Sequence, residues 1–259
     1  QQHQELILTD IKHLLSCNPT NPAYFNSSYS GDTTFFELDW IQLDGGLIDL
    51  GSDGNEFIFD CEGPSHKHWL EPYQLASRPI TNGEYIEFIN DGGYKRPELW
   101  LSDGWAAVKK LNWQSPLYWK NIDRTWSSFT LSGLEPIKYE APVCHVSHFE
   151  ADAYARWAGC RLPTEAEWEN AAKTIKIEGN FVESEAYDPL PTSATGLSQL
   201  YGDVWEWTTS PYVPYPGFKT AEGAVGEYNG KFMSGQMVLR GGSCVAPQNH
   251  IRCTYRNFF

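Results

Sequence analysis

The 259-residue chain carries 19 lysines and arginines against 33 aspartates and glutamates, which gives a formal net charge of −14 at pH 7. Such an acidic surface repels phosphate backbones and anionic lipids, so the composition argues against nucleic acid and membrane surfaces as partners. Hydrophobic residues make up 41% of the chain and aromatic residues 15%, which indicates a globular protein. No apolar run reaches the roughly 18 residues that a membrane span needs.

The six cysteines are scattered, without a C-x-x-C pair or a dense framework. In a chain of this length that pattern favours reduced thiols over disulfides, and with it a cytoplasmic protein. Cys244 and Cys253 are the closest pair. The cysteines are Cys17, Cys61, Cys144, Cys160, Cys244 and Cys253.

The first 17 residues predict a helix, because their apolar residues recur at helical spacing. The segment NPTNP (18–22) ends this helix, since proline removes a donor and disfavours helix in the residue before it. The polar, turn-rich stretch that follows predicts a linker over 18–34. A lone helix of this length cannot bury its apolar face by itself. We therefore expect it to be the last helix of a truncated helical domain, docked on residues 35–259 or on a neighbour. Its apolar residues are Leu6, Ile7, Ile11, Leu14 and Leu15.

Residues 35–259 predict one compact α+β domain with much irregular structure. Short β-type runs (FFELDWIQL, GLIDLG, FIFD and VLRGGSC) alternate with glycine and proline turns. Three helices carry a capping box at their start, in which an N-cap hydroxyl and a glutamate three residues on satisfy two backbone amides. Residues 92–140 are rich in aromatics but show no regular period. The capping pairs are Thr81 with Glu84, Ser147 with Glu150, and Thr164 with Glu167.

Several segments of the domain are dense in tryptophan, glutamate and arginine. These residues lock irregular loops by stacking and by bidentate pairing with carboxylates, so we interpret most of them as structural. No Ser-His-Asp order, phosphate loop or H-E-x-x-H motif is present. The residues in question are Arg161, Glu165, Glu167, Trp168, Trp205, Glu206, Trp207 and Arg240.

Taken together, four segments resemble the formylglycine-generating-enzyme (sulfatase-modifying factor) family in order and spacing. They are EPYQLASRPITNGEYIEFIND, APVCHVSHFEADAYARWAGCRLPTEAEWENAAK, YGDVWEWTTSPY and VLRGGSCVAPQNHIRCTYRN. The resemblance covers roughly residues 35–259. It implies a variant of the C-type-lectin-like fold with little regular secondary structure.

The resemblance also helps to choose among activities. True formylglycine-generating enzymes use two cysteines five residues apart, shortly after the R-G-G-S turn, to oxidise a cysteine of a sulfatase. Those places hold Ala246 and Ile251 here, while Cys244 and Cys253 are nine residues apart. Formylglycine generation is therefore the less favoured activity.

The N-terminal stretch QQHQELILTDIKHLLSCNP resembles the end of the metal-binding domain of ergothioneine-synthesis sulfoxide synthases. In that family a helical H-x-x-x-H-x-E motif supplies two of three histidine ligands of a non-haem iron(II). Two histidines four residues apart share one helical face. His3 and Glu5 match the second half of the motif, and the other two ligands would precede Gln1. The resemblance implies that His3 is an iron ligand and that the chain as given, with one ligand of three, is inactive.

The same resemblance implies substrate-binding residues. Gln2 would contact an imidazole, and Tyr228, in a loop EYNGKF, would reach towards it. Asn257 would meet the carboxylate of a betaine, with Phe258 and Phe259 near its trimethylammonium group, which aromatic faces attract. The sequence departs from some family members at Val225, where they carry a catalytic tyrosine, so no catalytic residue is assigned within the chain.

The resemblance thus implies the C-terminal portion of an O₂-dependent sulfoxide synthase that joins cysteine or γ-glutamylcysteine to N-trimethylhistidine in ergothioneine biosynthesis. Which of the two thiols is used stays open. The alternative from another class is a non-catalytic, lectin-like ligand-binding module. Related domains often hold a structural calcium ion, and Asp203 and Glu206 in YGDVWEW are its candidate oxygen donors.

Overall fold

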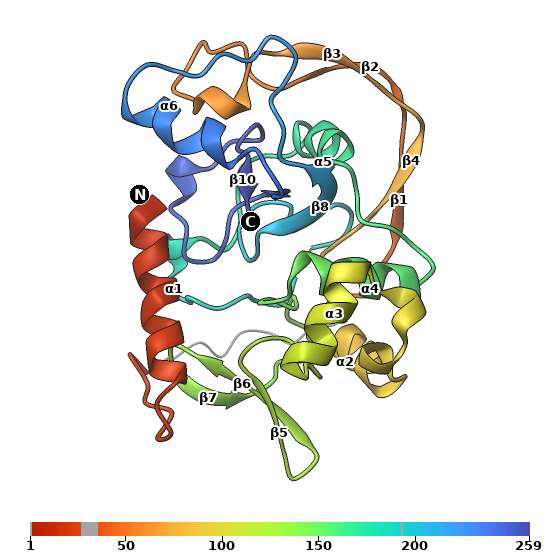
Figure 1. The fold of residues 1–259 in the computed structure, drawn as a ribbon, viewed down its shortest axis with the longest axis vertical. Coiled ribbons are helices and arrows are strands. Elements are labelled where there is room, and N and C mark those ends of the chain that lie inside the picture. The colour runs from red at the N-terminus through yellow and green to blue at the C-terminus, as the bar shows by residue number, and fades with distance from the viewer. Residues whose placement is uncertain (1, 27–35, 193) are drawn as a thin grey trace.

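The computed structural model describes residues 2–26, 36–192 and 194–259, whose fold is drawn in Figure 1. Its helices are α1 (Gln2–Ser16), α2 (Asn82–Asn90), α3 (Ser102–Leu111), α4 (His148–Trp157), α5 (Glu165–Ala172) and α6 (Ala224–Asn229). Its strands are β1 (Trp40–Leu43), β2 (Gly46–Leu50), β3 (His66–Leu70), β4 (Tyr73–Ala76), β5 (Trp119–Ile122), β6 (Thr125–Thr130), β7 (Gly133–Pro136), β8 (Glu206–Pro211), β9 (Met237–Arg240) and β10 (Asn257–Phe258). Short 3₁₀ turns include η1 (Asp60–Glu62), η2 (Gly93–Lys95), η3 (Pro97–Leu99), η4 (Val182–Ser184), η5 (Gly230–Phe232) and η6 (Gln248–His250).

The strands form small antiparallel sheets instead of one large one. β1 pairs with β4 and β2 with β3, while β5–β6–β7 and β10–β9–β8 make three-stranded sheets. In Figure 1, α1 runs along one side of the molecule and β1 and β4 run along the opposite side, with the other elements between them. This mixture of short helices, small sheets and long connections confirms the predicted α+β class.

The core is built around α5, which begins at the N-cap Thr164. The indole of Trp168 is 0% exposed and packs edge to face against Tyr201 at 5.7 Å. The expected structural interpretation of the arginines and glutamates holds here, because the Arg240 guanidinium lies over the Trp168 ring, 5.8 Å from its centroid. A helix with buried residues on every side belongs to the interior of a domain.

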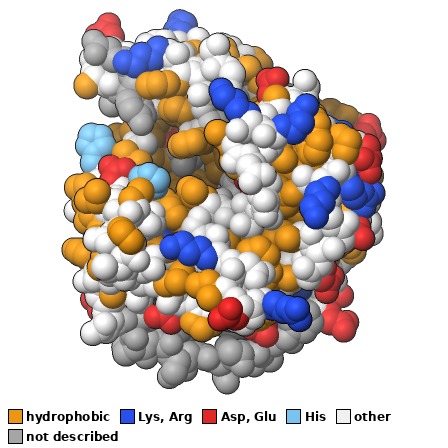
Figure 2. Space-filling model, turned by 60° about the horizontal axis from the view of Figure 1, so that its bottom comes forward, with side chains coloured by type: hydrophobic (Ala, Val, Ile, Leu, Met, Phe, Trp, Pro, Cys, Tyr) orange, Lys and Arg blue, Asp and Glu red, His pale blue; other side chains and the backbone are white. Residues whose placement is uncertain are grey.

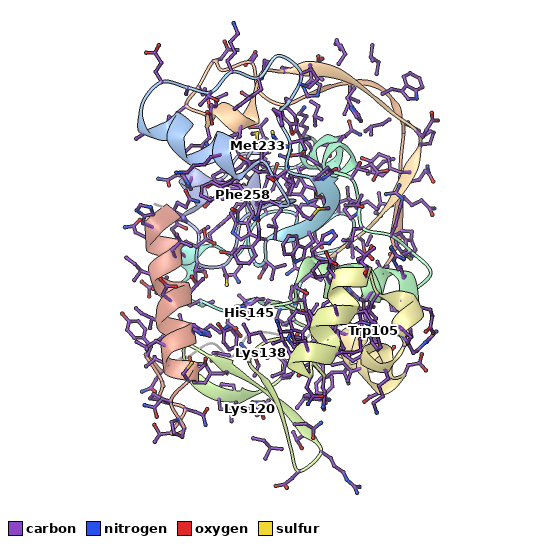
Figure 3. All side chains as sticks on the ribbon, in the orientation of Figure 1. Trp105, Lys120, Lys138, His145, Met233 and Phe258 are labelled. Carbon is purple, nitrogen blue, oxygen red and sulfur yellow. The ribbon has the colours of Figure 1, made fainter. Side chains whose placement is uncertain are left out.

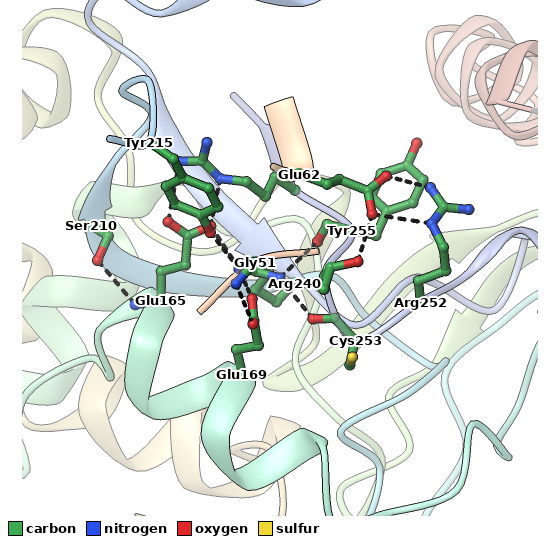
Figure 4. Close-up of polar contacts among 12 residues, drawn as sticks. Gly51, Glu62, Glu165, Glu169, Ser210, Tyr215, Arg240, Arg252, Cys253 and Tyr255 are labelled. Atoms are coloured by element: carbon green, nitrogen blue, oxygen red, sulfur yellow. Dashed lines mark hydrogen bonds and ion pairs between the residues drawn. The ribbon is translucent and has the colours of Figure 1, made fainter. Parts of the chain in front are cut away.

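Arg240 is the centre of a buried network of ion pairs (Figure 4). Its Nη2 donates to Glu165 Oε1 at 2.7 Å and to Glu169 Oε2 at 2.9 Å, and its Nη1 donates to the carbonyl of Cys253 at 2.8 Å. Arg256 donates to the same Glu165 carboxylate. Burial alone would raise the pKa of Glu165, but the two guanidinium groups outweigh burial and lower it.

All three predicted capping boxes are present. The hydroxyls of Thr81, Ser147 and Thr164 accept from the amides three residues on, and the glutamates at those positions return the bond. Because a capping box depends on residues close in the chain, its sequence signal is reliable.

The structure differs from the predictions between residues 92 and 140, which hold α3 and the sheet β5–β6–β7. Gly104 weakens the helical signal of α3 in the sequence, because glycine disfavours helix. Glycine is nevertheless required at this position, since a Cβ would lie 2.6 Å from the side chain of Phe149. The β5–β6 turn uses Asp123 and Arg124, both with positive φ, where an Asn-Gly pair would be the usual signal. The run FIFD (57–60) is not a strand.

The N-terminal helix is present as α1, and all six cysteines are free thiols. Of the predicted linker, residues 18–26 form no helix or strand and residues 27–34 lie outside the described part of the chain. In the described residues no helix is both long and apolar enough to cross a bilayer.

We predict that Arg240→Met lowers the free energy of unfolding by about 3–5 kcal/mol, because it leaves two buried carboxylates without their shared partner. Urea denaturation at pH 7 measures this. Arg156→Met is the matched control, since Arg156 is a partly exposed partner of Asp152 on α4, and its loss should cost about 0.5 kcal/mol. Equal losses for the two variants would contradict the central role of Arg240.

Candidate functional site

The first turns of α1 are docked on the domain through Glu5. Its Oε1 accepts a hydrogen bond from Trp205 Nε1 at 2.8 Å and another from Ser243 Oγ at 2.5 Å. Burial raises the pKa of Glu5, and the two hydrogen bonds offset part of that shift. The helix that carries the predicted metal ligand is thus tied to two loops that lie about 200 residues further along the chain.

Local backbone geometry puts the two partners of Glu5 in place. Trp205 follows a tight turn in which Gly202 and Asp203 both have positive φ. Ser243 follows Gly241 and Gly242, whose φ angles are +100° and +90°. A Cβ on Gly241 would lie 2.4 Å from the carbonyl oxygen of Leu200, so only glycine fits the turn.

His3 lies on a different side of α1 from Glu5. Residues two positions apart on a helix differ by about 200° around its axis. Because Glu5 points into the domain, His3 points outward, and its side chain is exposed. No group of three or more His, Cys, Asp or Glu side chains within residues 2–26, 36–192 and 194–259 is placed to hold a metal ion. The described residues alone therefore do not fit an iron site, and no chemical step can be derived through iron from them.

The two predicted substrate segments near the C-terminus lie together. Phe258 stacks on Tyr212, with centroids 4.4 Å apart, and on Phe232 at 5.4 Å. Phe232 ends η5, which directly follows α6. Figure 3 shows Met233 and Phe258 beside α6, and both pack on the same small apolar cluster. The segment that carries Tyr228 is therefore a neighbour of the strand that carries Phe258.

The remaining predicted substrate residues lie in different elements and differ in exposure. Tyr228 lies in helix α6, whereas a loop was expected, and its side chain is outside the described part of the structure. Asn257 pairs with Leu239 in the β9–β10 ladder and is half-buried. Phe259 is 85% exposed, and Gln2 is partly exposed at the start of α1. A surface hollow with apolar side chains around it is visible beside histidine side chains in Figure 2.

The two candidate calcium donors differ in what they can offer. Both carboxylate oxygens of Asp203 accept hydrogen bonds, from Asn180 and the amide of Leu190 on one oxygen and from Gln199 on the other. Glu206 accepts from Trp168 Nε1 at 3.0 Å through Oε2, while its buried Oε1 has no partner among the described residues. Burial raises the pKa of Glu206 to about 8, and Asp203 adds to this. A pKa of about 8 leaves this carboxyl largely protonated at pH 7, and the described residues contain no group of three or more His, Cys, Asp and Glu side chains that could hold a metal ion. The calcium site therefore stays a prediction, for which Glu206 offers one free oxygen and Asp203 offers none.

A cleft of about 880 Å³ lies between β4, α2, α4 and the YGDVWEW segment. Two of its walls carry the same arrangement, R-x-x-T-x-x-E, which sequence reasoning missed. Arg78 pairs with Glu84 at 2.9 Å, and Arg161 pairs with Glu167 at 2.6 Å. Trp205 lines the cleft as well as holding Glu5. The volume suits a small ligand.

The fold and the YGDVWEW and VLRGGSC loops are those of a known protein family. The sequence profile described as the sulfatase-modifying factor enzyme 1-like domain matches residues 31–190 and 174–259. The chain belongs to this family.

Among individual proteins, the chain is similar to a hercynine oxygenase of Mycobacterium tuberculosis, with 37% identity over 223 residues that cover 77% of this chain and 52% of that protein. An inactive C-alpha-formylglycine-generating enzyme 2 of Bos taurus is 30% identical, with 68% and 71% covered. Ergothioneine biosynthesis protein 1 of Schizosaccharomyces pombe is 28% identical, with 78% and 26% covered. The chain spans about half the length of the mycobacterial relative.

The three capping boxes give a prediction about pH. Burial alone would raise the pKa of Glu84, but Arg78 outweighs it and lowers the pKa. No arginine pairs with Glu150 among the described residues, and burial raises its pKa while Tyr94 and Ser147 offset only part of the shift. At pH 7, Glu84→Gln should cost about 2 kcal/mol of unfolding free energy, whereas Glu150→Gln should cost nothing or stabilise.

The direction in which each carboxylate changes stability with pH follows from the direction of its pKa shift. A lowered folded pKa gives stability above the unfolded value of 4.5 that is lost as the pH falls through the folded pKa. A raised folded pKa gives stability below 4.5 that is lost as the pH rises through the folded pKa. Urea titrations between pH 3 and 7 should therefore show the Glu84→Gln penalty shrinking towards acid. The same penalty for both variants at pH 7 would refute this account.

The free oxygen of Glu206 gives a separate prediction. Adding calcium to chelator-treated protein at a hundred times its Kd should raise Tm by about 5 °C. Glu206→Gln should abolish this rise, while Asp53→Asn, a change at an exposed carboxylate, should leave it intact. Scanning calorimetry with and without calcium makes the comparison, and an unchanged Tm in the parent protein would count against a calcium site.

Proposed function

We propose that the chain is the C-terminal portion of an iron(II)- and O₂-dependent sulfoxide synthase of ergothioneine biosynthesis. The reaction joins cysteine or γ-glutamylcysteine to C2 of the imidazole of N-trimethylhistidine, in a domain with a C-type-lectin-like variant of the fold. The names of the mycobacterial and yeast relatives support this proposal. The absence of cysteines at positions 246 and 251, where Ala246 and Ile251 stand, argues against formylglycine generation.

One observation carries the proposal. The Glu5 carboxylate of the H-x-E helix is bound by Trp205 and Ser243, which belong to the YGDVWEW and VLRGGSC segments of the family domain. A ligand-binding module without metal chemistry has no use for such a helix on these loops. The docking supports a working unit in which α1 and the domain act together.

The roles of the chain's own residues in this proposal are binding and orientation. Gln2 and Tyr228 hold the imidazole of the substrate. Asn257 donates to its carboxylate, and Phe258 offers an aromatic face to the trimethylammonium group, as aromatic rings do for quaternary ammonium ions. His3 binds iron together with ligands that the described residues do not supply. Iron, when bound, would supply the oxygen chemistry.

The experiment uses the full-length protein, including residues that precede Gln1. His3→Ala should abolish iron(II) binding, measured by metal analysis after anaerobic reconstitution, and sulfoxide formation, measured by mass spectrometry with each thiol. His68→Ala is the matched control, because His68 is an exposed histidine on β3. Tyr228→Phe should raise KM for N-trimethylhistidine about tenfold through the loss of one hydrogen bond and leave kcat nearly unchanged. Full iron binding by His3→Ala would refute the proposal, and a protein that binds N-trimethylhistidine without turnover would favour the non-catalytic module.

A further inference from the structure

A second polar contact holds α1 to the domain, far from Glu5. Lys12 lies with its Nζ 2.7 Å from His145 Nε2 and 5.5 Å from the centroid of the Tyr118 ring. The next residue, His13, places Nδ1 3.1 Å from the Tyr118 hydroxyl. The rings of Tyr118 and His145 meet edge to face at 4.8 Å. We call these four residues the Lys12 cluster, and Figure 3 shows His145 between α1 and α3.

The charges of the Lys12 cluster determine which atom donates and which accepts in the contact between Lys12 and His145. Lys12 is only 8% exposed and forms no ion pair with a carboxylate in the described part of the chain. Burial and the charge of Lys12 hold the pKa of His145 well below its usual range, so the imidazole is neutral. Because an ammonium group can only donate, His145 Nε2 must accept and its Nδ1 must carry the proton. A buried ammonium without this acceptor would lose its water and gain nothing in return.

The backbone under the cluster is held in an uncommon conformation. Tyr118 and His145 have φ angles of +72° and +59°, a region that non-glycine residues seldom occupy. The amide of Leu117 donates to the carbonyl of His145 at 3.2 Å, which ties the two loops together. Strained residues that touch each other in this way indicate a constraint that the surrounding structure maintains.

Apolar packing alone would not fix α1 on the domain. Leu6, Ile7 and Leu14 of this helix are 46%, 55% and 71% exposed. Glu5 and Lys12, seven residues apart, share one face of the helix, and both face the domain. Apolar contacts tolerate sliding and rotation, whereas two hydrogen bonds to fixed partners allow one rotation and one register.

We propose that Lys12 and His145 are positioning residues that, together with Glu5, set the rotation of α1 about its axis and so the direction of Gln2 and His3. The inference rests on the proposed function, in which Gln2 and His3 act at the site. Lys12 itself lies nine residues from His3, about 13 Å along the helix, and cannot touch the substrate there.

Hydrogen–deuterium exchange of the 259-residue protein tests the contact without metal or turnover. Lys12→Met keeps the aliphatic length and removes the ammonium group. It should speed amide exchange in Gln2–Ser16 at least tenfold and leave exchange in α5 unchanged. Lys109→Met, a change at an exposed lysine over Trp105 on α3, is the matched control and should change neither. If Lys12→Met fails to fold, Tyr118→Phe, which removes only the bond to His13, should show a smaller acceleration.

Nitrogen NMR of the His145 ring gives a signature that general loosening would not produce. The parent protein at pH 7.5 should show the tautomer with the proton on Nδ1, and Lys12→Met should yield the mixture of a free imidazole. In the full-length protein, Lys12→Met should lower kcat about tenfold and Lys12→Arg should recover most of it. Unchanged exchange in α1, or a His145 proton on Nε2 in the parent protein, overturns the proposal. If these results are as expected but His3→Ala still binds iron, the positioning contact stands and the proposed function fails.

Discussion

The domain depends on the buried ion pairs that Arg240 forms with Glu165 and Glu169. In the described part of the chain the strands are short, from two to six residues, and no long ladder ties the sheets together. Arg240 replaces that ladder by joining β9 to α5, through Glu165 and Glu169, and to the C-terminal segment, through the carbonyl of Cys253. Breaking a buried pair of this kind leaves uncompensated charge, so the helix and both segments are held as a unit.

The position of the docking loops follows from the same residue. Arg240 is opposite Glu206 in the antiparallel β8–β9 ladder. Trp205 directly precedes Glu206, and the segment 241–243 directly follows Arg240. Because the two strands are antiparallel, both loops leave the ladder at the same end. Glu5 bridges that end by accepting from both. The N-terminal helix is therefore held by a surface whose geometry the buried ion pairs determine.

Local signals in the sequence predicted local structure well. The capping boxes of α2, α4 and α5 and the pairing of arginines with carboxylates were foreseen because they depend on neighbouring residues or on chemistry that has few alternatives. Helix α3 was missed because a glycine such as Gly104 usually indicates the end of a helix. Glycine is needed at this position because the side chain of Phe149, 45 residues away, leaves no room for a Cβ. The contact between Lys12 and His145 joins residues 133 positions apart and has no sequence signal at all.

Helix α1 shows that the apolar face of a helix need not be the face that docks on its own domain. A surface helix usually turns its apolar stripe to the core and its charges to water. Here Glu5 and Lys12 face the domain, while Ile7 and Leu14 lie outward on the side of His3. Exposed apolar side chains cost hydration free energy until another surface covers them. In the proposed function, the element that completes the ligands of His3 approaches from this outer side. Covering Ile7 and Leu14 would then stabilise its docking, while the polar anchors keep α1 from rotating towards it.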